Sequence, residues 1–145
     1  KLGLDELSKI IKKISTHNGG LLLIDYGYLK PNNENTLQSV IKHKKNNLLE
    51  NLGNADVTSL VNFKLLNEFF AQNNLKVKRI TTQKNFLEKM GILERANNLS
   101  KKMNFREKSN LYLRLKRLMD IKLMGELFKV IFAYKYKKDN FLGFK

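Results

Sequence analysis

The residue types best suited to bind a ligand stand together near the start of the chain. Asp25, Tyr26 and Tyr28 follow Gly20–Ile24, a stretch without a polar side chain, and Gly27 separates the two tyrosines. Such a stretch predicts a buried strand covered on both faces, as in a parallel or mixed sheet between helix layers. Its last residues would lie at the carboxyl edge of the sheet, where open α/β sheets bind ligands. The alternative is that Asp25 caps a turn and Gly27 makes a bend.

A helix is expected before this strand. Apolar residues recur at three- and four-residue spacing from Leu4 to Ile14, with acids near the start and lysines near the end, as the helix dipole favours. Asn18 and Gly19 supply a stop. A helix followed by a buried strand forms the second half of a βαβ unit, so its first strand is expected upstream of Lys1.

An excursion from the main fold is predicted in the middle of the chain. Residues 30–35 read as a turn or loop, and residues 36–41 alternate as a short, half-exposed strand. The polar residues 42–54, which include His43, are typical of a lid or a substrate-binding arm.

The remaining pattern alternates helices and strands and predicts an α/β fold. Asp56 or Thr58 can serve as the N-cap of the first of these helices. The predicted elements are a helix over residues 60–70, a strand over 75–81, two short helical pieces over 86–93 parted by Gly91, a helix over 104–118 and a strand over 127–134, followed by an exposed tail over 135–138. No glycine-rich strand-to-helix turn of a nucleotide-binding kind occurs in this sequence.

The composition predicts one soluble domain without cysteine chemistry. The 145 residues suffice for a single core, and because no run of about 18 apolar residues occurs, we expect a cytoplasmic chain without a membrane span. Without cysteine there are no disulfides, and two histidines leave little for a metal site. The net charge of +15 permits an acidic partner such as nucleic acid or a membrane surface. The abundance of Lys and Asn is equally what an A/T-biased coding sequence would produce.

An ordered series of short motifs resembles the C-terminal half of the MidA family of S-adenosylmethionine-dependent methyltransferases. That group includes the mitochondrial complex I assembly factor that methylates a protein arginine. The motifs span residues 4–144 and comprise the strand ending in Asp25-Tyr26-Gly27, the segment Thr36-Leu37-Gln38 before His43, the box from Asn54 to Phe63, Thr82-Gln83 with Phe86-Leu87 and Gly91-Ile92, and the approach to the last strand from Met124 to Val130.

The resemblance implies the C-terminal portion of a class I, Rossmann-like methyltransferase sheet, forming one partial domain over residues 1–145. The last strand, residues 127–134, would insert antiparallel between residues 21–25 and 77–81. A helical insertion over residues 84–120 would cover one edge. S-adenosylmethionine would be bound by an N-terminal half that this chain lacks. That half is therefore an expected partner, and no cofactor-binding residue or metal ligand is expected here.

The resemblance also implies roles at the end of the first strand. Asp25 would be the catalytic carboxylate that grips the guanidinium of an acceptor arginine in a protein substrate, possibly a complex I subunit. Tyr26 and Tyr28 would wall the pocket and favour the cationic methyl donor. Gly27 would let the chain turn closely past the substrate.

Three further residues are candidates for binding the substrate, and each also has a structural interpretation. His43 could orient the substrate from the loop or be a solvated residue among lysines. Thr58 could contact substrate or cap a helix, and Gln83 could contact substrate or belong to a turn.

Five positions depart from the family pattern, one of them being the missing proline before Met124-Gly125. Lys42 and Lys84 stand where the family has glycine, Leu60 where it has histidine, and Asn62 where it has aspartate. Two other classes of function stay open: a basic nucleic-acid-binding module, disfavoured because the charge is spread along the chain, and a non-catalytic partner subunit. Self-association is also left open.

Overall fold

A computed structural model describes residues 2–30, 35–42, 44–137 and 139–144. In chain order its elements are α1 (Leu2–Thr16), β1 (Gly20–Tyr28), β2 (Gln38–Ile41), β3 (Lys44–Asn46), β4 (Asp56–Thr58), β5 (Val61–Asn62), α2 (Phe63–Gln72), β6 (Lys76–Val77), β7 (Thr81–Thr82), α3 (Gln83–Lys89), α4 (Ile92–Ser100), α5 (Phe105–Met119), α6 (Met124–Leu127) and β8 (Phe128–Tyr134).

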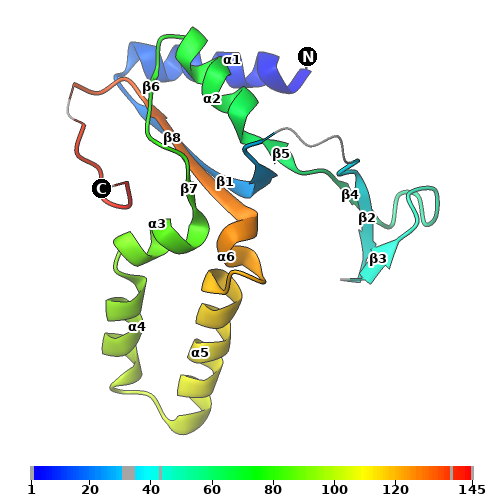
Figure 1. The fold of residues 1–145 in the computed structure, drawn as a ribbon, viewed down its shortest axis with the longest axis vertical. Helices are drawn as coiled ribbons and strands as arrows, with labels where there is room; N and C mark the ends of the chain where they lie inside the picture. Colours follow the sequence, from blue (N-terminus) through cyan, green and yellow to red (C-terminus); the bar gives the residue numbers. More distant parts are fainter. Residues whose placement is uncertain (1, 31–34, 43, 138, 145) are drawn as a thin grey trace.

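A mixed sheet forms the centre of the molecule (Figure 1). Its strand order is β5-β1-β8-β6, and β7 also pairs with β8. β8 runs antiparallel to β1 on one side and to β6 and β7 on the other. The position that the family resemblance implied for the last strand is therefore confirmed. β5 pairs parallel with the end of β1, at Gly27 and Tyr28.

A second, three-stranded antiparallel sheet, here called the β-arm, is formed by β2, β3 and β4 in the order β3-β2-β4. It follows the end of β1 and lies apart from helices α3 to α6 (Figure 1). The predicted excursion contributes β3 to this arm, whereas His43 and residues 31–34 of the predicted loop lie outside the described residues.

The predicted N-cap of α2 was wrong. Asp56–Thr58 forms β4, because it pairs with β2 in the arm, and Thr58 faces Gln38 there. The helix begins at Phe63, and its N-cap is Asn62, whose side-chain oxygen accepts a hydrogen bond from the Leu65 N–H at 3.0 Å. Aspartate and asparagine are both good N-caps, so the exchange of the family's aspartate for Asn62 preserves this cap.

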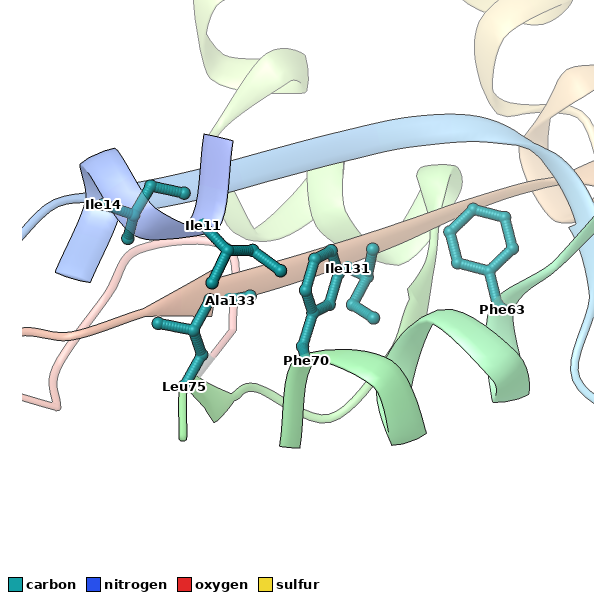
Figure 2. Close-up of a cluster of buried hydrophobic side chains, with 7 residues drawn as sticks. All are labelled: Ile11, Ile14, Phe63, Phe70, Leu75, Ile131 and Ala133. Atoms are coloured by element: carbon teal, nitrogen blue, oxygen red, sulfur yellow. The ribbon is translucent and has the colours of Figure 1, made fainter. Parts of the chain in front are cut away.

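The hydrophobic core lies between one face of the sheet and the helices α1 and α2 (Figure 2). It is built from Ile11 and Ile14 of α1, Phe63 and Phe70 of α2, Leu75, and Ile131 and Ala133 of β8. Leu21 and Leu23 of β1 pack against it from the same face. The predicted amphipathic helix before β1 thus buries its apolar face, as expected.

The opposite face of β1 is less covered than the sequence predicted. Leu22 and Ile24 are each 43% exposed, because alternate residues of a strand point to opposite faces and α1 and α2 cover only one of them. The expectation of a strand buried on both faces was therefore wrong. On the side of Gly20–Tyr26 away from β8, no other strand pairs with β1 in the described part of the chain.

Two details of the C-terminal half differ from the sequence prediction. The strand expected over residues 75–81 is two short strands, β6 and β7, both paired with β8. The chain after β8 folds back, so that the rings of Phe141 and Phe144 lie 4.8 and 5.9 Å from the ring of Phe132. Residues 135–137 are exposed, as predicted.

Three of the four helices between β7 and β8 lie where helices were predicted, but α4 extends to Ser100 and the short helix α6 was not predicted. Gly91, with a φ of +79°, separates α3 from α4, and α5 begins with a capping box between Asn104 and Glu107. α3 and α6 contact the sheet, whereas α4 and α5 extend away from it as an antiparallel pair (Figure 1). The expectation that the whole insertion covers one edge of the sheet was therefore wrong for α4 and α5.

Candidate functional site

Asp25 is a half-buried carboxylate near the end of β1. Its Oδ1 accepts a hydrogen bond from the backbone N–H of Tyr26 at 2.8 Å. Lys129 lies directly opposite on β8, but its amine donates instead to the backbone carbonyl of Glu126. In the part of the chain that the structure describes, no ion pair neutralises Asp25. The second carboxylate oxygen is therefore available to a cationic ligand.

Burial lowers the pKa of the Lys129 amine, and the nearby Glu126 carboxylate opposes this effect. Lys129 is thus a partly desolvated cation at the start of β8, close along the ladder to Asp25.

A hollow of about 600 Å³ lies beside Tyr26, between the end of β1 and the β-arm. The Tyr26 ring makes an edge-on contact with Phe128, with ring centroids 5.5 Å apart, which fixes it at the hollow's wall. The other lining residues come from 35–39, from Lys45, Asn46 and Leu48 of the arm, and from Leu60 and Leu127.

Hydrogen bonds hold the arm's side of this hollow in place. The Thr36 hydroxyl accepts from the Leu60 N–H at 3.3 Å, and the buried Ser39 hydroxyl accepts from the Asn46 amide at 3.1 Å. Leu60, where the family has histidine, therefore lies at the hollow. Sequence reasoning did not single out Ser39, Lys45, Asn46 or Leu127 as site residues. The signal for Ser39 was its place directly after the Thr36-Leu37-Gln38 motif.

Gly27 faces the protein's own chain. A Cβ atom at this position would lie 2.2 Å from the carbonyl oxygen of Val61 and 2.7 Å from the Phe63 ring, so β5 can approach only a glycine. Gly27 lies within β1 and makes no bend, contrary to the alternative interpretation. Tyr28, half-buried, is paired with Asn62. Neither residue lines the hollow, and their contact with substrate stays a prediction.

Thr58 and Gln83 lie outside the lining of the hollow beside Tyr26. Thr58 is half-buried at the end of β4. Gln83 is 7% exposed, and its Nε2 donates to the carbonyl oxygen of Leu118 at 2.8 Å, which ties α3 to the end of α5. This hydrogen bond explains why a side-chain amide is favoured at position 83. His43 lies outside the described residues.

The residues around Asp25 do not build a cradle for S-adenosylmethionine. Nucleotide-like cofactors are held by glycine-rich backbone and by an acid that binds the ribose. Among the described residues no acidic side chain lines the hollow beside Tyr26, and the space next to Gly27 is filled by Val61 and Phe63. The described residues also contain no group of three His, Asp or Glu side chains arranged to hold a metal ion. None of the described helices is both long and apolar enough to cross a membrane.

The chain resembles known proteins in sequence and in fold. It is 31% identical over 93 residues to the protein from Caenorhabditis elegans named "Protein arginine methyltransferase NDUFAF7 homolog, mitochondrial". The aligned region covers 64% of this chain and 22% of that protein. An uncharacterised protein from Burkholderia thailandensis has the same fold over 92% of this chain, with a TM-score of 0.77 and 22% identity.

A second structure from Burkholderia thailandensis, of a protein bound to S-adenosyl-homocysteine, matches 92% of this chain with a TM-score of 0.72 and 24% identity. This chain spans 38% and 37% of the two solved structures, so it corresponds to less than half of each relative.

A family described as "Putative S-adenosyl-L-methionine-dependent methyltransferase" matches residues 3–81, which is more than half of this chain. The matched region includes α1, β1, the β-arm and α2, and therefore the Asp25 segment and most of the hollow. The chain belongs to this family, the MidA family of S-adenosylmethionine-dependent methyltransferases.

Proposed function

We propose that this chain is the C-terminal portion of a class I methyltransferase that modifies an arginine side chain of a protein. The observation that carries the proposal is Asp25, a half-buried carboxylate at the end of a central strand that no cation neutralises among the described residues. A carboxylate in such a place suits a guanidinium, which offers two parallel N–H donors. The relative from Caenorhabditis elegans, whose name specifies protein arginine, supports this acceptor class.

In this proposal the chain's own residues bind and orient the acceptor. Asp25 accepts the guanidinium N–H groups while its bond to the Tyr26 N–H holds the carboxylate in one orientation. Tyr26, the next residue of β1, walls a hollow that is large enough to receive a side chain together with part of its backbone, whereas Asp25 is not among the residues that line this hollow. Thr36 and Gln38 face the same hollow and supply polar contacts. The methyl donor would be held by residues outside this chain.

The proposed partner is an N-terminal methyltransferase half. The free side of Gly20–Tyr26 offers unpaired backbone groups, and Leu22 and Ile24 offer an apolar face, each 43% exposed. An open edge beside an uncovered apolar face is what a central strand presents when its neighbouring strand is absent. The matched structures are more than twice as long as this chain, which leaves ample sequence to cover both surfaces.

The finer features of the family resemblance belong to the same proposal. Residues 1–145 would be one partial domain, with residues 84–120 as its helical insertion. The acceptor arginine would belong to a subunit of respiratory complex I. Tyr28, Thr58 and Gln83, which like Asp25 are not among the residues that line the hollow beside Tyr26, would support the bound acceptor rather than grip it.

The test uses this chain combined with the N-terminal half of a MidA-family methyltransferase. Methyl transfer from isotope-labelled S-adenosylmethionine is measured on an arginine-containing peptide and on the same peptide with lysine in place of arginine. The proposal predicts transfer to the arginine peptide alone, because lysine cannot make the two parallel hydrogen bonds. Transfer to lysine alone, or to neither peptide while the cofactor is bound, would contradict it.

A further inference from the structure

A second hollow, of about 320 Å³, lies between the end of β1 and the β7-α3 segment. Leu29, directly after β1, and Lys129, at the start of β8, form one side of it. Residues 79–82, Asn85, Lys89 and Phe144 form the rest. It is separate from the hollow beside Tyr26, because the two share no lining residue.

The described lining of this second hollow carries positive charge and no acidic side chain. Arg79 and Lys129 contribute two cations, and no Asp or Glu lines the hollow among the residues that the structure describes. Two other hollows of the described structure pair arginine with Glu107, which offsets their charge. Arg79 and Lys129 therefore face this hollow without such an acid among the described residues.

Several hydrogen-bond donors in the second hollow are uncommitted within the described structure. The Arg79 guanidinium and the Asn85 side-chain amide make no hydrogen bond or ion pair there. Asn85 takes part only through its backbone N–H, which donates to the Thr82 hydroxyl. Thr81, which carries a hydroxyl, lines the same hollow. A guanidinium, an amide and a hydroxyl together match the acceptors of an oxyanion.

Lys129 adds a partly desolvated cation. One of its three ammonium protons is donated to the Glu126 carbonyl, which leaves two for a ligand. Burial lowers the pKa of this amine, and a bound anion would oppose that shift by stabilising the charged form. A ligand that carries negative charge is therefore favoured over a neutral or cationic one.

We propose that this second hollow is a binding site for an oxyanion, namely a carboxylate or a phosphate group, held by Arg79, Asn85 and Lys129. The site goes beyond the proposed methyl transfer, and its occupancy requires neither the cofactor nor the N-terminal half. Its position at the end of β1 and the start of β8 places the anion at the same edge of the sheet as Asp25.

The test is an NMR titration of the full ¹⁵N-labelled chain with sodium phosphate and, separately, with sodium acetate, at constant ionic strength. The site predicts saturable shifts of the Thr81, Thr82 and Asn85 amides with at least one of the two anions, and the stronger of the two identifies the ligand class. Arg79→Gln should weaken this binding by roughly fivefold or more, because it removes charge-assisted hydrogen bonds.

The matched control is Arg106→Gln, which removes the same charge from an exposed position on α5 that lines none of the described hollows. It should leave the affinity unchanged. Asn85→Ala, at a second exposed position of the hollow, should weaken binding in the same direction as Arg79→Gln. Absence of saturable shifts with both anions, or equal weakening by Arg79→Gln and Arg106→Gln, would overturn the proposal in favour of diffuse attraction to a basic protein.

Discussion

Asp25 and Lys129 lie directly opposite each other on β1 and β8, yet their side chains form no ion pair. The lysine amine bonds to the Glu126 carbonyl, and the carboxylate bonds to the Tyr26 N–H. Direct contact between oppositely charged side chains on neighbouring strands normally stabilises a sheet. Its absence here leaves the Asp25 carboxylate for a ligand, which is the basis of the proposed arginine binding.

Asp25→Asn tests that role in the protein combined with its N-terminal half. Asparagine keeps the oxygen that accepts the Tyr26 N–H but removes the charge, so the fold should be unaffected. The KM for an arginine peptide should rise by roughly tenfold or more, as expected when a charged hydrogen-bond partner is lost. Asp5→Asn, at an exposed position of α1, is the matched control and should change nothing. An unchanged KM for Asp25→Asn would remove this residue from acceptor binding.

Lys42 occupies a backbone conformation that suits glycine. Its φ is +48°, at the turn between β2 and β3, where the family resemblance predicts glycine. The left-handed conformation costs a non-glycine residue about 1–2 kcal/mol, and glycine loses about 0.5–1 kcal/mol of chain entropy, so Lys42→Gly should stabilise the protein by about 0.5–1 kcal/mol.

Urea denaturation measures this change, with Lys44→Gly as the control. Lys44 is an exposed residue of β3, where glycine weakens a strand, so its replacement should destabilise the protein instead. Equal destabilisation by the two substitutions would show that the turn conformation at Lys42 carries no cost.

The exposed face of β1 can be tested by placing a charge on either side of the strand. Ile24→Lys lies on the uncovered face and should leave the thermal stability of the chain nearly unchanged while preventing its association with the N-terminal half. Leu23→Lys lies against the core and should destabilise the chain itself by several kcal/mol. Association is measured by analytical ultracentrifugation. If Ile24→Lys associates normally, the N-terminal half does not cover this face.

The tail after β8 should make stability depend on pH in the alkaline range. The Tyr134 hydroxyl donates to Asp139, and burial together with this bond raises the pKa of Tyr134 from 10.0 to about 12. Because the folded-state pKa is the higher one, this stabilisation is complete below pH 10 and is lost as the pH rises towards 12. Tyr134→Phe should therefore show a smaller loss of stability over that interval.

Tyr136→Phe is the control for this pH dependence, because Tyr136 is exposed and its replacement should leave the loss of stability over that interval unchanged. Unfolding by urea between pH 9 and pH 12, together with tyrosinate absorbance, checks both variants.

At acidic pH the same contact has the opposite dependence, because Asp139 stabilises the fold in its charged form. The hydrogen bond from Lys78, at 2.6 Å, and the one from Tyr134 lower the pKa of Asp139. Its contribution to the free energy of unfolding is therefore present above the pKa of the unfolded state and is lost as the pH falls through the lower pKa of the folded state.

Local signals in the sequence predicted much of the fold. The apolar pattern over residues 104–118, the glycine at position 91 and the β-prone run 127–134 each indicated a local element, and α5, the break between α3 and α4, and β8 form there. The ordered motifs added what local signals could not, namely that β8 lies antiparallel between β1 and the β6 and β7 strands.

The features that the sequence did not predict depend on distant contacts. Asp56–Thr58 became a strand because β2 was available to pair with it, although its residue types suit a helix cap equally well. The return of Phe141 to Phe132 depends on a ring contact that has no periodic signal. The exposure of Leu22 and Ile24 is a third case, because an apolar run does not reveal whether this chain or another supplies the cover.

The same limit applies to the candidate site. The Asp25-Tyr26 segment and the Thr36-Leu37-Gln38 motif were recognisable from residue types and order, and the structure brings Tyr26 together with Thr36 and Gln38 at one hollow. The hydrogen bond from Gln83 to the Leu118 carbonyl oxygen was not predicted, and contact of Gln83 with substrate stays a prediction. Its partner lies 35 residues away, beyond the reach of any local pattern.

The central claim is that this chain supplies the acceptor side of a methyltransferase whose cofactor is held by another half. Calorimetric titration with S-adenosylmethionine tests it most directly, first on this chain alone and then on the chain combined with an N-terminal MidA-family half, with that half alone as a control. The claim predicts no binding by this chain alone, and methyl transfer to an arginine peptide only from the combination. Saturable binding of S-adenosylmethionine by the isolated chain, or a combined protein that binds the cofactor but transfers no methyl group, would contradict it.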